Sequence, residues 1–389
     1  MRPDPADDAA RRNTRRLETL AVHAGGEADA HNGAVAPPLH LSTTFKHGPA
    51  AERLAGYEYQ REGNPTQDRL ETALAALDGG EGALAYGSGM AAMTAALECL
   101  PAGSEVLVPE DCYAGLRSLG AEFLPERGVS VRRVDQCDAA AVAAAMTPSV
   151  RMIWAETPSN PQLRIADLAA LSSIAKQHGA LLAVDNTFAT PVLQRPIALG
   201  ADVVMHSTTK YMGGHSDVMG GALVFAKRDA LFEKAAHRRH ITGNILAPFS
   251  AWLTLRGLRS LPARMAWHCA NARRVAGFLA AQPAVEAVYW PGLTTHRNHA
   301  VAARQMCDFG GMVSVTFKGG RDAALAFAGA VEVFTNATSL GGVESLIEHR
   351  ASVEGPNPVS PPGLLRLSVG LEHGDDLVAD LQRGIEAIG

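Results

Sequence analysis

The sequence contains few cysteines, no zinc-binding histidine motif and no long apolar run. Its five cysteines are scattered and none belongs to a C-x-x-C pair, so neither a disulfide framework nor a zinc ribbon is indicated. The 14 histidines include no H-E-x-x-H motif. The charged start of the chain lacks the apolar core of a signal peptide, and no apolar run approaches the roughly 18 residues of a membrane span. These absences predict a cytoplasmic protein with no metal site and no membrane contact.

Charge of one sign is not in excess either. The net charge is −5 over 389 residues, and the contents of 47% hydrophobic and 19% charged residues are ordinary for a compact protein of two or three domains. The one basic tract, Arg11, Arg12, Arg15 and Arg16, lies among acidic residues and is typical of a polar leader. We therefore expect no nucleic-acid partner.

Lysine is scarce, since six of the 35 basic residues are lysines, and this draws attention to Lys210. A lysine amine condenses with an aldehyde, and a carboxylate such as Asp185 keeps a pyridine nitrogen protonated. Ser207 and Thr209 flank the lysine and offer hydroxyls to a phosphate. Aldehyde, ring nitrogen and phosphate occur together in pyridoxal 5'-phosphate (PLP), which the sequence predicts as the cofactor. The alternative is a lysine on a solvated loop; the apolar strand that precedes Asp185 favours the cofactor.

Short apolar runs alternate with helical stretches from about residue 82 to residue 225. Unbroken apolar runs indicate strands buried on both faces, and their alternation with helices indicates a mostly parallel sheet. The predicted strands are Ala83–Tyr86, Glu105–Val108, Ser130–Val134, Met152–Glu156, Leu181–Asp185, Val203–His206 and Ala222–Phe225. The predicted helices are Met90–Leu100, Gly115–Leu124, Asp138–Met146 and Ile165–His178.

Polar groups suited to PLP follow the ends of three of these strands. Parallel sheets bind ligands at the carboxyl ends of their strands. Asp185 ends one strand, Lys210 follows another, and Gly87–Met90 follows a third and opens a helix. Free N–H groups and the dipole at a helix start favour an anion, although a glycine pair there is more often a plain turn. The three groups are predicted to meet at one edge of the sheet.

The ends of the chain differ from this α/β region. Residues 1–55 are predicted to form an extended arm, residues 56–245 the large cofactor-binding domain, and residues 246–389 a smaller α+β domain. Gly355–Gly363 contains four prolines and is predicted to be a loop. The small domain is predicted to contain the helices Phe249–Leu258 and Ala263–Leu279 and the strands Val285–Tyr289, Met312–Phe317, Val331–Phe334 and Leu364–Val369.

Four further side chains each have two interpretations. Tyr113 follows a predicted strand, and it either stacks on a flat cofactor and moves protons or is a half-buried residue at a helix start. Tyr59 and Arg61 suit a phosphate by their chemistry, but their segment is rich in turn formers and also fits a solvated loop. Arg366 suits a carboxylate through its planar fork, or an ion pair within a strand.

Seven motifs, in order from about Leu20 to the C-terminus, give the chain its family resemblance. It resembles the PLP-dependent trans-sulfuration (Cys/Met metabolism) enzymes and is closest to cystathionine gamma-synthase and cystathionine gamma-lyase. The motifs are Y-Q-R-E-G-N-P-T from Tyr59, G-S-G-M from Gly87, E-T-P-S-N-P from Glu156, V-D-N-T-F from Val184, S-T-T-K-Y from Ser207, S-L-G-G-V-E-S from Ser339 and L-L-R-L-S-V-G from Leu364.

The resemblance implies a fold, an assembly and a role for each site residue. The fold is the α/β PLP-dependent transferase fold type I, which is aspartate-aminotransferase-like and has a smaller C-terminal α+β domain. The assembly is a homotetramer of two dimers, in which the arm reaches the neighbouring subunit and the active sites are shared. The implied catalytic residues are Lys210, which binds the PLP aldehyde and moves protons, and Tyr113, which stacks on the ring. The other implied cofactor ligands are Asp185 at the ring nitrogen and, at the phosphate, Gly89, Met90, Ser207 and Thr209, with Tyr59 and Arg61 from the neighbouring subunit. The implied substrate ligands are Arg366, Asn160 and Ser339, with Thr338 beside them.

The chain departs from the family pattern at three places. Thr338 stands where the synthase and the gamma-lyase usually have a glutamate that meets the distal ammonium of cystathionine. Gly115 and Leu116 stand where methionine gamma-lyases usually have a cysteine. His349–Gly355, with the sequence H-R-A-S-V-E-G, stands where the family usually has H-P-A-S-M-T-H, and the segment that follows it is short. These changes indicate a remodelled substrate entrance.

The predicted function is PLP-dependent gamma-elimination or gamma-replacement on a sulfur-containing or O-acyl-homoserine amino acid. The alternatives are an O-acylhomoserine sulfhydrylase and a gamma-lyase for methionine or another gamma-substituted amino acid. A non-enzymatic protein with the same fold is disfavoured because Lys210 and Asp185 are both present. A nicotinamide-binding enzyme is disfavoured because no G-x-G-x-x-G follows the first predicted strand.

Overall fold

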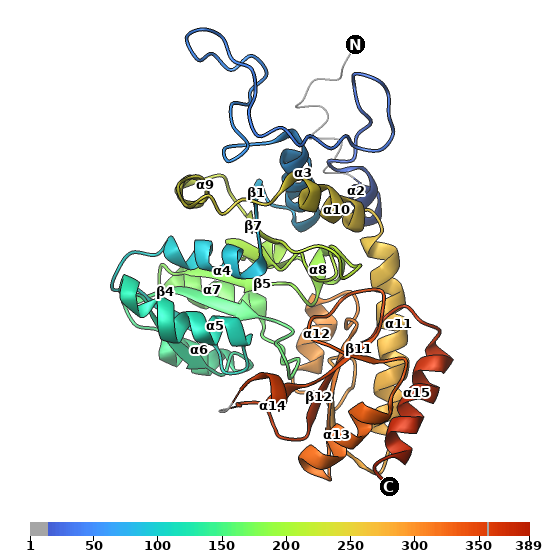
Figure 1. Ribbon diagram of the computed structural model, residues 1–389. Coiled ribbons are helices and arrows are strands. Elements are labelled where there is room, and N and C mark those ends of the chain that lie inside the picture. Colours follow the sequence, from blue (N-terminus) through green and yellow to red (C-terminus); the bar gives the residue numbers. More distant parts are fainter. Residues whose placement is uncertain (1–14, 356–357) are drawn as a thin grey trace.

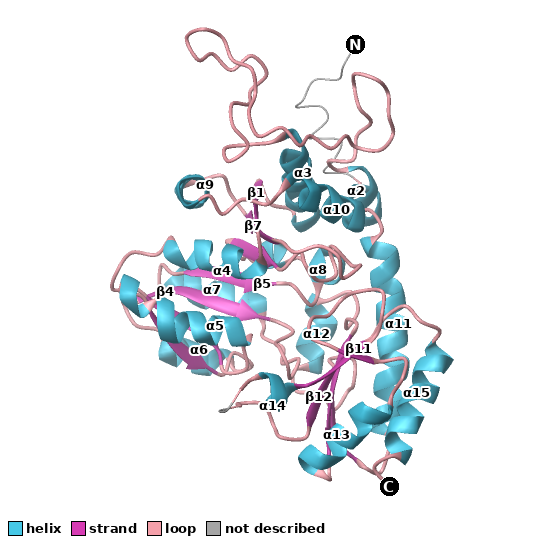
Figure 2. Ribbon diagram, viewed as in Figure 1, coloured by secondary structure: helices cyan, strands magenta, loops and turns pink. Residues whose placement is uncertain are grey.

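The computed structural model describes residues 15–355 and 358–389, which form two sheets and the helices around them (Figures 1 and 2). The strands of the larger sheet are β1 (Gly82–Tyr86), β2 (Glu105–Pro109), β3 (Ser130–Val134), β4 (Val150–Glu156), β5 (Leu181–Asp185), β6 (Val203–His206) and β7 (Gly221–Phe225). Their order in the sheet is β1-β7-β6-β5-β4-β2-β3. Only β7 runs antiparallel to its neighbours, so the sheet is mostly parallel, as predicted.

All seven strands predicted for this region are confirmed. Their apolar runs have a physical cause, because every residue of β1, β6 and β7 is buried and separate clusters of core side chains pack against the sheet. The helices of this region are α3 (Pro65–Asp78), α4 (Gly89–Glu98), α5 (Ala114–Ser118), α6 (Ala139–Ala145), α7 (Leu168–Gln177), α8 (Thr190–Leu193) and α9 (Ala230–Thr242). Short 3-10 turns occupy Pro125–Arg127 and Pro196–Leu199.

The predicted helix Gly115–Leu124 is not a single α-helix. It begins as α5 and continues as a π-helical segment over Leu119–Phe123. The predicted helix Ile165–His178 starts later, because the Asp167 side chain accepts a hydrogen bond from the Ala170 N–H and caps the start of α7. The periodicity therefore located both helices correctly. The hydrogen-bond pattern of the first and the starting residue of the second differ from the prediction.

The smaller sheet has the order β10-β11-β12-β9-β8, with α11, α13 and α15 packed on its strands and on one another. Its strands are β8 (Val285–Tyr289), β9 (Met312–Phe317), β10 (Thr335–Asn336), β11 (Leu346–His349) and β12 (Leu364–Ser368). The helices of this half are α10 (Pro248–Leu258), α11 (Leu261–Ala280), α12 (His299–Gln305), α13 (Gly320–Ala330), α14 (Arg350–Val353) and α15 (Gly374–Glu386). The fold is therefore the predicted α/β architecture, a mostly parallel sheet with a smaller C-terminal α+β part.

One predicted strand of the smaller sheet, Val331–Phe334, is wrong. The buried carboxylate of Asp380 accepts hydrogen bonds from the backbone N–H groups of Glu332, Val333 and Phe334 at 2.8–2.9 Å. N–H groups that point at one carboxylate are not available to a neighbouring strand. The short strand β10 begins only after them, and it pairs with β11, a strand that was not predicted.

The N-terminal segment leaves the body of the molecule. After α2 (Leu17–His23), residues 24–63 form loops that extend away from the sheets, in blue in Figure 1. The segment rejoins the body at α3, where the Asn64 side chain accepts a hydrogen bond from the Thr66 N–H and Pro65 occupies the first helical position. Arg11 and Arg12 lie outside the described residues. The boundaries of the arm and of the two domains stay predictions.

Among the helices of residues 15–355 and 358–389, none has the length and apolar character needed to cross a membrane. The same residues contain no group of three or more histidine, cysteine or acidic side chains arranged to hold a metal ion. All five cysteines are free thiols. The predicted cytoplasmic location stays a prediction.

Candidate active site

A cavity of about 440 Å³ lies at the carboxyl edge of the larger sheet, where segments of the smaller sheet meet it. Asp185 is the last residue of β5, and Lys210 lies in the turn that follows β6. All but two of the predicted site residues line this one cavity. They are Gly89, Met90, Tyr113, Asn160, Asp185, Ser207, Thr209, Lys210, Thr338, Ser339 and Arg366.

The amine of Lys210 lies between the two parts of the molecule. Its Nζ donates a hydrogen bond to Ser339 Oγ at 2.7 Å. Burial and, to a lesser extent, the nearby Arg366 guanidinium lower the pKa of Lys210 to about 8, while Glu348 opposes the shift. About one tenth of amines with this pKa are uncharged at pH 7, a much larger fraction than for an ordinary lysine, and both nucleophilic attack on an aldehyde and proton abstraction require the uncharged form.

The carboxylate of Asp185 is fixed by the loop that follows it. The Thr187 N–H donates to Asp185 Oδ1 at 3.0 Å. Burial raises the pKa of Asp185, and hydrogen bonds from Thr187 partly oppose that rise. A protonated pyridine nitrogen placed here would favour the charged carboxylate, because an opposite charge nearby stabilises it. The group therefore suits the role predicted for it.

The start of α4 forms a cradle for an anion. Ser88 Oγ accepts a hydrogen bond from the Ala91 N–H, while the N–H groups of Gly89 and Met90 belong to the first turn, which has no partners within the helix. A Cβ atom at position 89 would lie 2.8 Å from Ser207 Oγ. Glycine is therefore needed for the helix start to approach the Ser207 hydroxyl.

Thr209 has a second task besides the one predicted for it. Its hydroxyl donates to the Gly220 carbonyl at 3.1 Å and accepts from the Gly220 N–H at 3.0 Å. These two bonds hold the turn that presents Lys210. Any contact of Thr209 with a phosphate comes in addition to them.

Tyr113 lines the cavity from the start of α5. Its backbone N–H donates to Glu156 Oε2 at 2.8 Å, and its side chain is 40% exposed. A Cβ atom at position 115 would lie 2.4 Å from the Tyr113 ring and 2.5 Å from the sulfur of Met90. Gly115 therefore allows the ring to pack close to the backbone beside the cavity.

Arg366, in β12, is buried and lines the side of the cavity that the smaller sheet contributes. Its Nη1 donates to Asn160 Oδ1 at 3.0 Å, and its Nη2 donates to the Ser339 carbonyl at 2.9 Å. Nη2 also lies 2.9 Å from Oε2 of Glu348, the residue opposite it in β11. Burial lowers the pKa of Arg366 to about 10, with Glu348 opposing the shift and Arg350 adding to it.

Ser339 joins Lys210 to Arg366. Its hydroxyl accepts from the lysine and its carbonyl accepts from the arginine, while its own backbone has φ of +84°. A non-glycine residue in this region carries strain of about 1–3 kcal/mol, which the surrounding contacts must offset. Thr338, next in the chain, lines the same cavity.

Tyr59 and Arg61 are the two predicted site residues that the cavity does not include. Tyr59 is 47% exposed, the Arg61 guanidinium lies 5.6 Å from the centre of its ring, and Arg61 Nη1 donates to the His240 carbonyl at 3.1 Å. Within one chain these side chains do not line the cavity. Their predicted role in a neighbouring subunit's site stays a prediction.

Three charged residues of the cavity had no predicted role, namely Glu156, Glu348 and Arg350. Glu156 ends β4 and accepts hydrogen bonds from the N–H groups of Tyr113 and Asn160, both at 2.8 Å. Burial and the neighbouring Asp185 raise its pKa well above the ordinary value. Its place at a strand end was a usable signal, because Asp185 ends the next strand. Glu348 offered no such signal, because its strand was not predicted.

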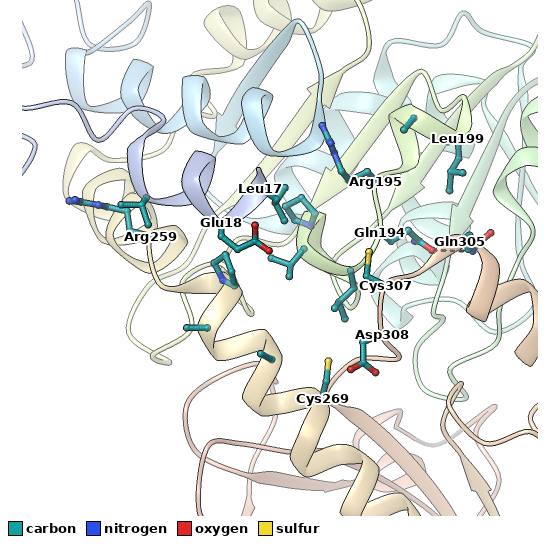
Figure 3. A pocket seen from close by; sticks show the side chains of 18 residues that line it. Leu17, Glu18, Gln194, Arg195, Leu199, Arg259, Cys269, Gln305, Cys307 and Asp308 are labelled. Atoms are coloured by element: carbon teal, nitrogen blue, oxygen red, sulfur yellow. Dashed lines mark hydrogen bonds between the residues drawn. The ribbon is translucent and has the colours of Figure 1, made fainter. Parts of the chain in front are cut away.

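A second cavity, of about 820 Å³, lies near α2, α8 and α11 (Figure 3). Its lining is mostly aliphatic and contains no lysine. It therefore lacks the amine that a PLP site requires.

The smaller cavity supplies a partner for each reactive part of PLP. Lys210 suits the aldehyde, Asp185 the ring nitrogen, Tyr113 a ring face, and the start of α4 with Ser207 the phosphate. A close approach at Gly89 and an amine with a lowered pKa are what such a group requires. The residues present therefore fit the cofactor.

Comparison with known proteins agrees with this geometry. The family described as Cys/Met metabolism PLP-dependent enzyme matches residues 18–386. A cystathionine gamma-synthase of Mycobacterium bovis is 47% identical over 94% of this chain and 96% of that protein. An L-methionine gamma-lyase of Pseudomonas putida is 42% identical over 95% of this chain and 97% of that protein. The crystal structure of metB from Corynebacterium glutamicum covers 97% of this chain and 100% of its own, with a TM-score of 0.95 and 41% identity. The chain therefore belongs to the Cys/Met metabolism family of PLP-dependent enzymes, the lyases and transferases of trans-sulfuration.

Proposed function

We propose that this enzyme catalyses gamma-elimination or gamma-replacement on an amino acid that carries a thioether or an acyl ester at Cγ. The observation that carries the proposal is the link through Ser339, which holds the amine of Lys210 and the guanidinium of Arg366 on one residue. An amine beside a carboxylate-binding group is positioned to act at the carbon between an amino acid's amine and carboxylate. The similarity to cystathionine gamma-synthases supports the same reaction class.

Each residue has a defined task in this scheme. Arg366 binds the substrate α-carboxylate, and Asn160 and Ser339 orient its guanidinium. Lys210 removes the proton from Cα and returns it elsewhere, since its pKa of about 8 allows both protonation states near neutral pH. PLP, when bound, supplies an electron sink for the pair left at Cα. Asp185 maintains that sink by holding the proton on the ring nitrogen.

Tyr113 is the candidate for proton transfer at the γ-substituent. Its side chain lines the cavity and is partly exposed, so a substituent at the entrance can reach its hydroxyl. Phenylalanine at this position would keep the ring face for stacking and remove the hydroxyl. We expect Tyr113→Phe to retain PLP and to slow release of the substituent, measured by single-turnover assay.

We also propose the shared-site homotetramer. Its support is that Tyr59 and Arg61, although chemically suited to phosphate, lie outside the cavity of their own chain on a segment that extends from the body. Light scattering would measure the assembly. Mixing inactive Lys210→Ala and Arg61→Ala proteins should then regenerate activity, because some dimer sites would receive an intact residue from each chain. Absence of regeneration in exchanged dimers would contradict the shared site.

A sulfhydrylase is the second candidate, and Thr338 is the observation in its favour. This neutral residue gives a distal ammonium no charge partner, so a small nucleophile such as sulfide is accommodated as well as cysteine. Four assays separate the reactions: cystathionine alone, acyl-homoserine with cysteine, acyl-homoserine with sulfide, and methionine alone. Turnover in any of the four assays supports the proposed reaction class, and the assay that responds identifies the leaving group and the nucleophile. A PLP-loaded enzyme that turns over none of these substrates would contradict the proposal.

A further inference from the structure

Arg350 is a buried cation in the same cavity with no task in the scheme above. It begins α14, two residues after Glu348, and its side chain is 8% exposed. Nη1 donates to Glu348 Oε2, and Nη2 lies 3.6 Å from Glu354 Oε1. Its Nε has no hydrogen-bond partner within residues 15–355 and 358–389. Burying a guanidinium with so few partners is costly, so its charge needs an explanation.

Arg264 shows how this chain buries a guanidinium for structure alone. All three of its side-chain nitrogens donate hydrogen bonds, to Ser260 Oγ and to the carbonyls of Tyr211 and Gly257, at 2.6–3.1 Å. Arg350 has one such bond, and its acceptor is an anion. The difference indicates that Arg350 acts through its charge on Glu348 rather than by fastening the backbone.

Glu348 is shared between two arginines. Its Oε2 accepts from Arg350 and lies 2.9 Å from Arg366 Nη2. Glu354, the next acid along, is shared between Arg350 and Arg117, whose Nη2 lies 3.3 Å away. Three guanidinium groups therefore face two carboxylates, so these five side chains together carry one excess positive charge. That excess would balance the negative charge of one α-carboxylate.

We propose that Arg350 is a positioning residue that keeps Arg366 attractive to the substrate α-carboxylate by sharing Glu348 with it. Without Arg350, Glu348 would pair with Arg366 alone and the cluster would be neutral before substrate arrives. The inference rests on the proposed role of Arg366. It deepens that role, because it assigns the affinity for any α-amino acid to Arg366, Glu348 and Arg350 together and not to Arg366 alone.

Arg350→Gln is the variant that tests the proposal. KM is expected to rise about tenfold for every substrate turned over, whatever its γ-substituent, because the charge-assisted attraction between Arg366 and the α-carboxylate is weakened. The kcat should change little, since that attraction acts on the bound substrate and the transition state alike. Glu348→Gln/Arg350→Gln restores the excess positive charge and should return KM toward that of the parent enzyme. Arg117→Gln removes the same charge one ion pair further away and should have a smaller effect.

A binding measurement separates this proposal from the reaction itself. L-Norleucine and L-norleucinamide differ in the α-carboxylate and have no γ-substituent to release. Calorimetry on the PLP-loaded enzyme should give a clear preference for norleucine, and Arg350→Gln should reduce that preference about tenfold. This result holds even if the enzyme turns over none of the assayed substrates, in which case only the proposed reaction fails.

Two outcomes would overturn the role of Arg350. One is an unchanged norleucine preference in Arg350→Gln. The other is a KM effect confined to substrates with a distal carboxylate, which would mean that Arg350 binds the far end of the substrate. Because each test compares two ligands on one protein, partial misfolding cancels from the ratio. Arg350→Lys, which retains the charge, gives a second variant and should keep most of the preference.

Discussion

The two halves of the active site are built differently. The half proposed to hold the cofactor (Gly89, Asp185, Ser207 and Lys210) comes from the start of α4, the end of β5 and the turn after β6, at one edge of the mostly parallel sheet. The substrate half (Ser339, Glu348, Arg350 and Arg366) comes from antiparallel strands and the segments beside them, and buried ion pairs hold it together. Backbone geometry thus dominates the first half and charge balance the second. Changes in the two halves should therefore fail in different ways.

Lys210→Ala should give the largest effect, because it removes the reactive group of the cofactor half. Turnover and exchange of the substrate α-proton are expected to fall at least about a thousandfold, since a positioned acid–base group contributes that order of magnitude. Exchange is measured by NMR in deuterated water. Lys318→Ala, on the exposed surface, is the matched control. Substantial α-proton exchange in the Lys210→Ala variant would contradict the proposed role of Lys210 as the group that removes the α-proton.

Arg366→Lys should give the next largest effect, and this effect should be on substrate binding and turnover but not on PLP binding. Lysine keeps the charge but not the planar fork, so kcat/KM is expected to fall about a hundredfold, while PLP affinity stays near that of the parent. Spectroscopic PLP titration and steady-state kinetics give the two values. Arg273→Lys, an exposed arginine of α11, is the control. Equal losses of PLP and substrate binding would mean that the halves are not separable.

Gly89→Ala is the reciprocal change in the cofactor half. The added Cβ would lie 2.8 Å from Ser207 Oγ, so the start of α4 must move, and PLP affinity is expected to fall about tenfold. Gly277→Ala adds the same methyl group within α11, where no atom lies within 4 Å. PLP titration of both variants checks the prediction. Equal PLP affinity in the two would show that the close approach at Gly89 is unimportant.

The smallest effect tests the contact between the halves. In the enzyme without PLP, the rate at which an amine-reactive reagent labels Lys210 should increase with pH along a titration curve whose midpoint is about pH 8, because only the uncharged amine reacts. Arg366 lowers this pKa, so Arg366→Gln should shift the midpoint upward by a fraction of a pH unit. Peptide mapping identifies the labelled lysine. A downward shift would contradict the assigned contact.

Sequence patterns located the residues of the proposed cofactor half, whose roles stay predictions. Its residues follow apolar runs that are buried on both faces, so the ends of β5 and β6 could be located and Asp185 and Lys210 assigned to one edge. The seven strands of this sheet were predicted for the same reason.

The substrate half could not be read in the same way. Two of the four residues of β11, Glu348 and His349, are polar, and they are buried with partners on other segments. Likewise, Val331–Phe334 reads as an apolar strand, but a carboxylate nearly fifty residues away binds its N–H groups. Pairing between distant charged residues leaves no periodic signal in one sequence.

The attachment of Lys210 and Arg366 to Ser339 has a stereochemical consequence. Arg366 would hold the carboxylate of a bound amino acid, and the nitrogen would point toward Lys210. Two of the four substituents of Cα then have fixed positions. The walls of the cavity fix a third, so the hydrogen of one mirror image points toward the amine and that of the other points away. We therefore expect the enzyme to discriminate between L- and D-enantiomers through this rigid serine, without any dedicated chiral contact at the γ-substituent.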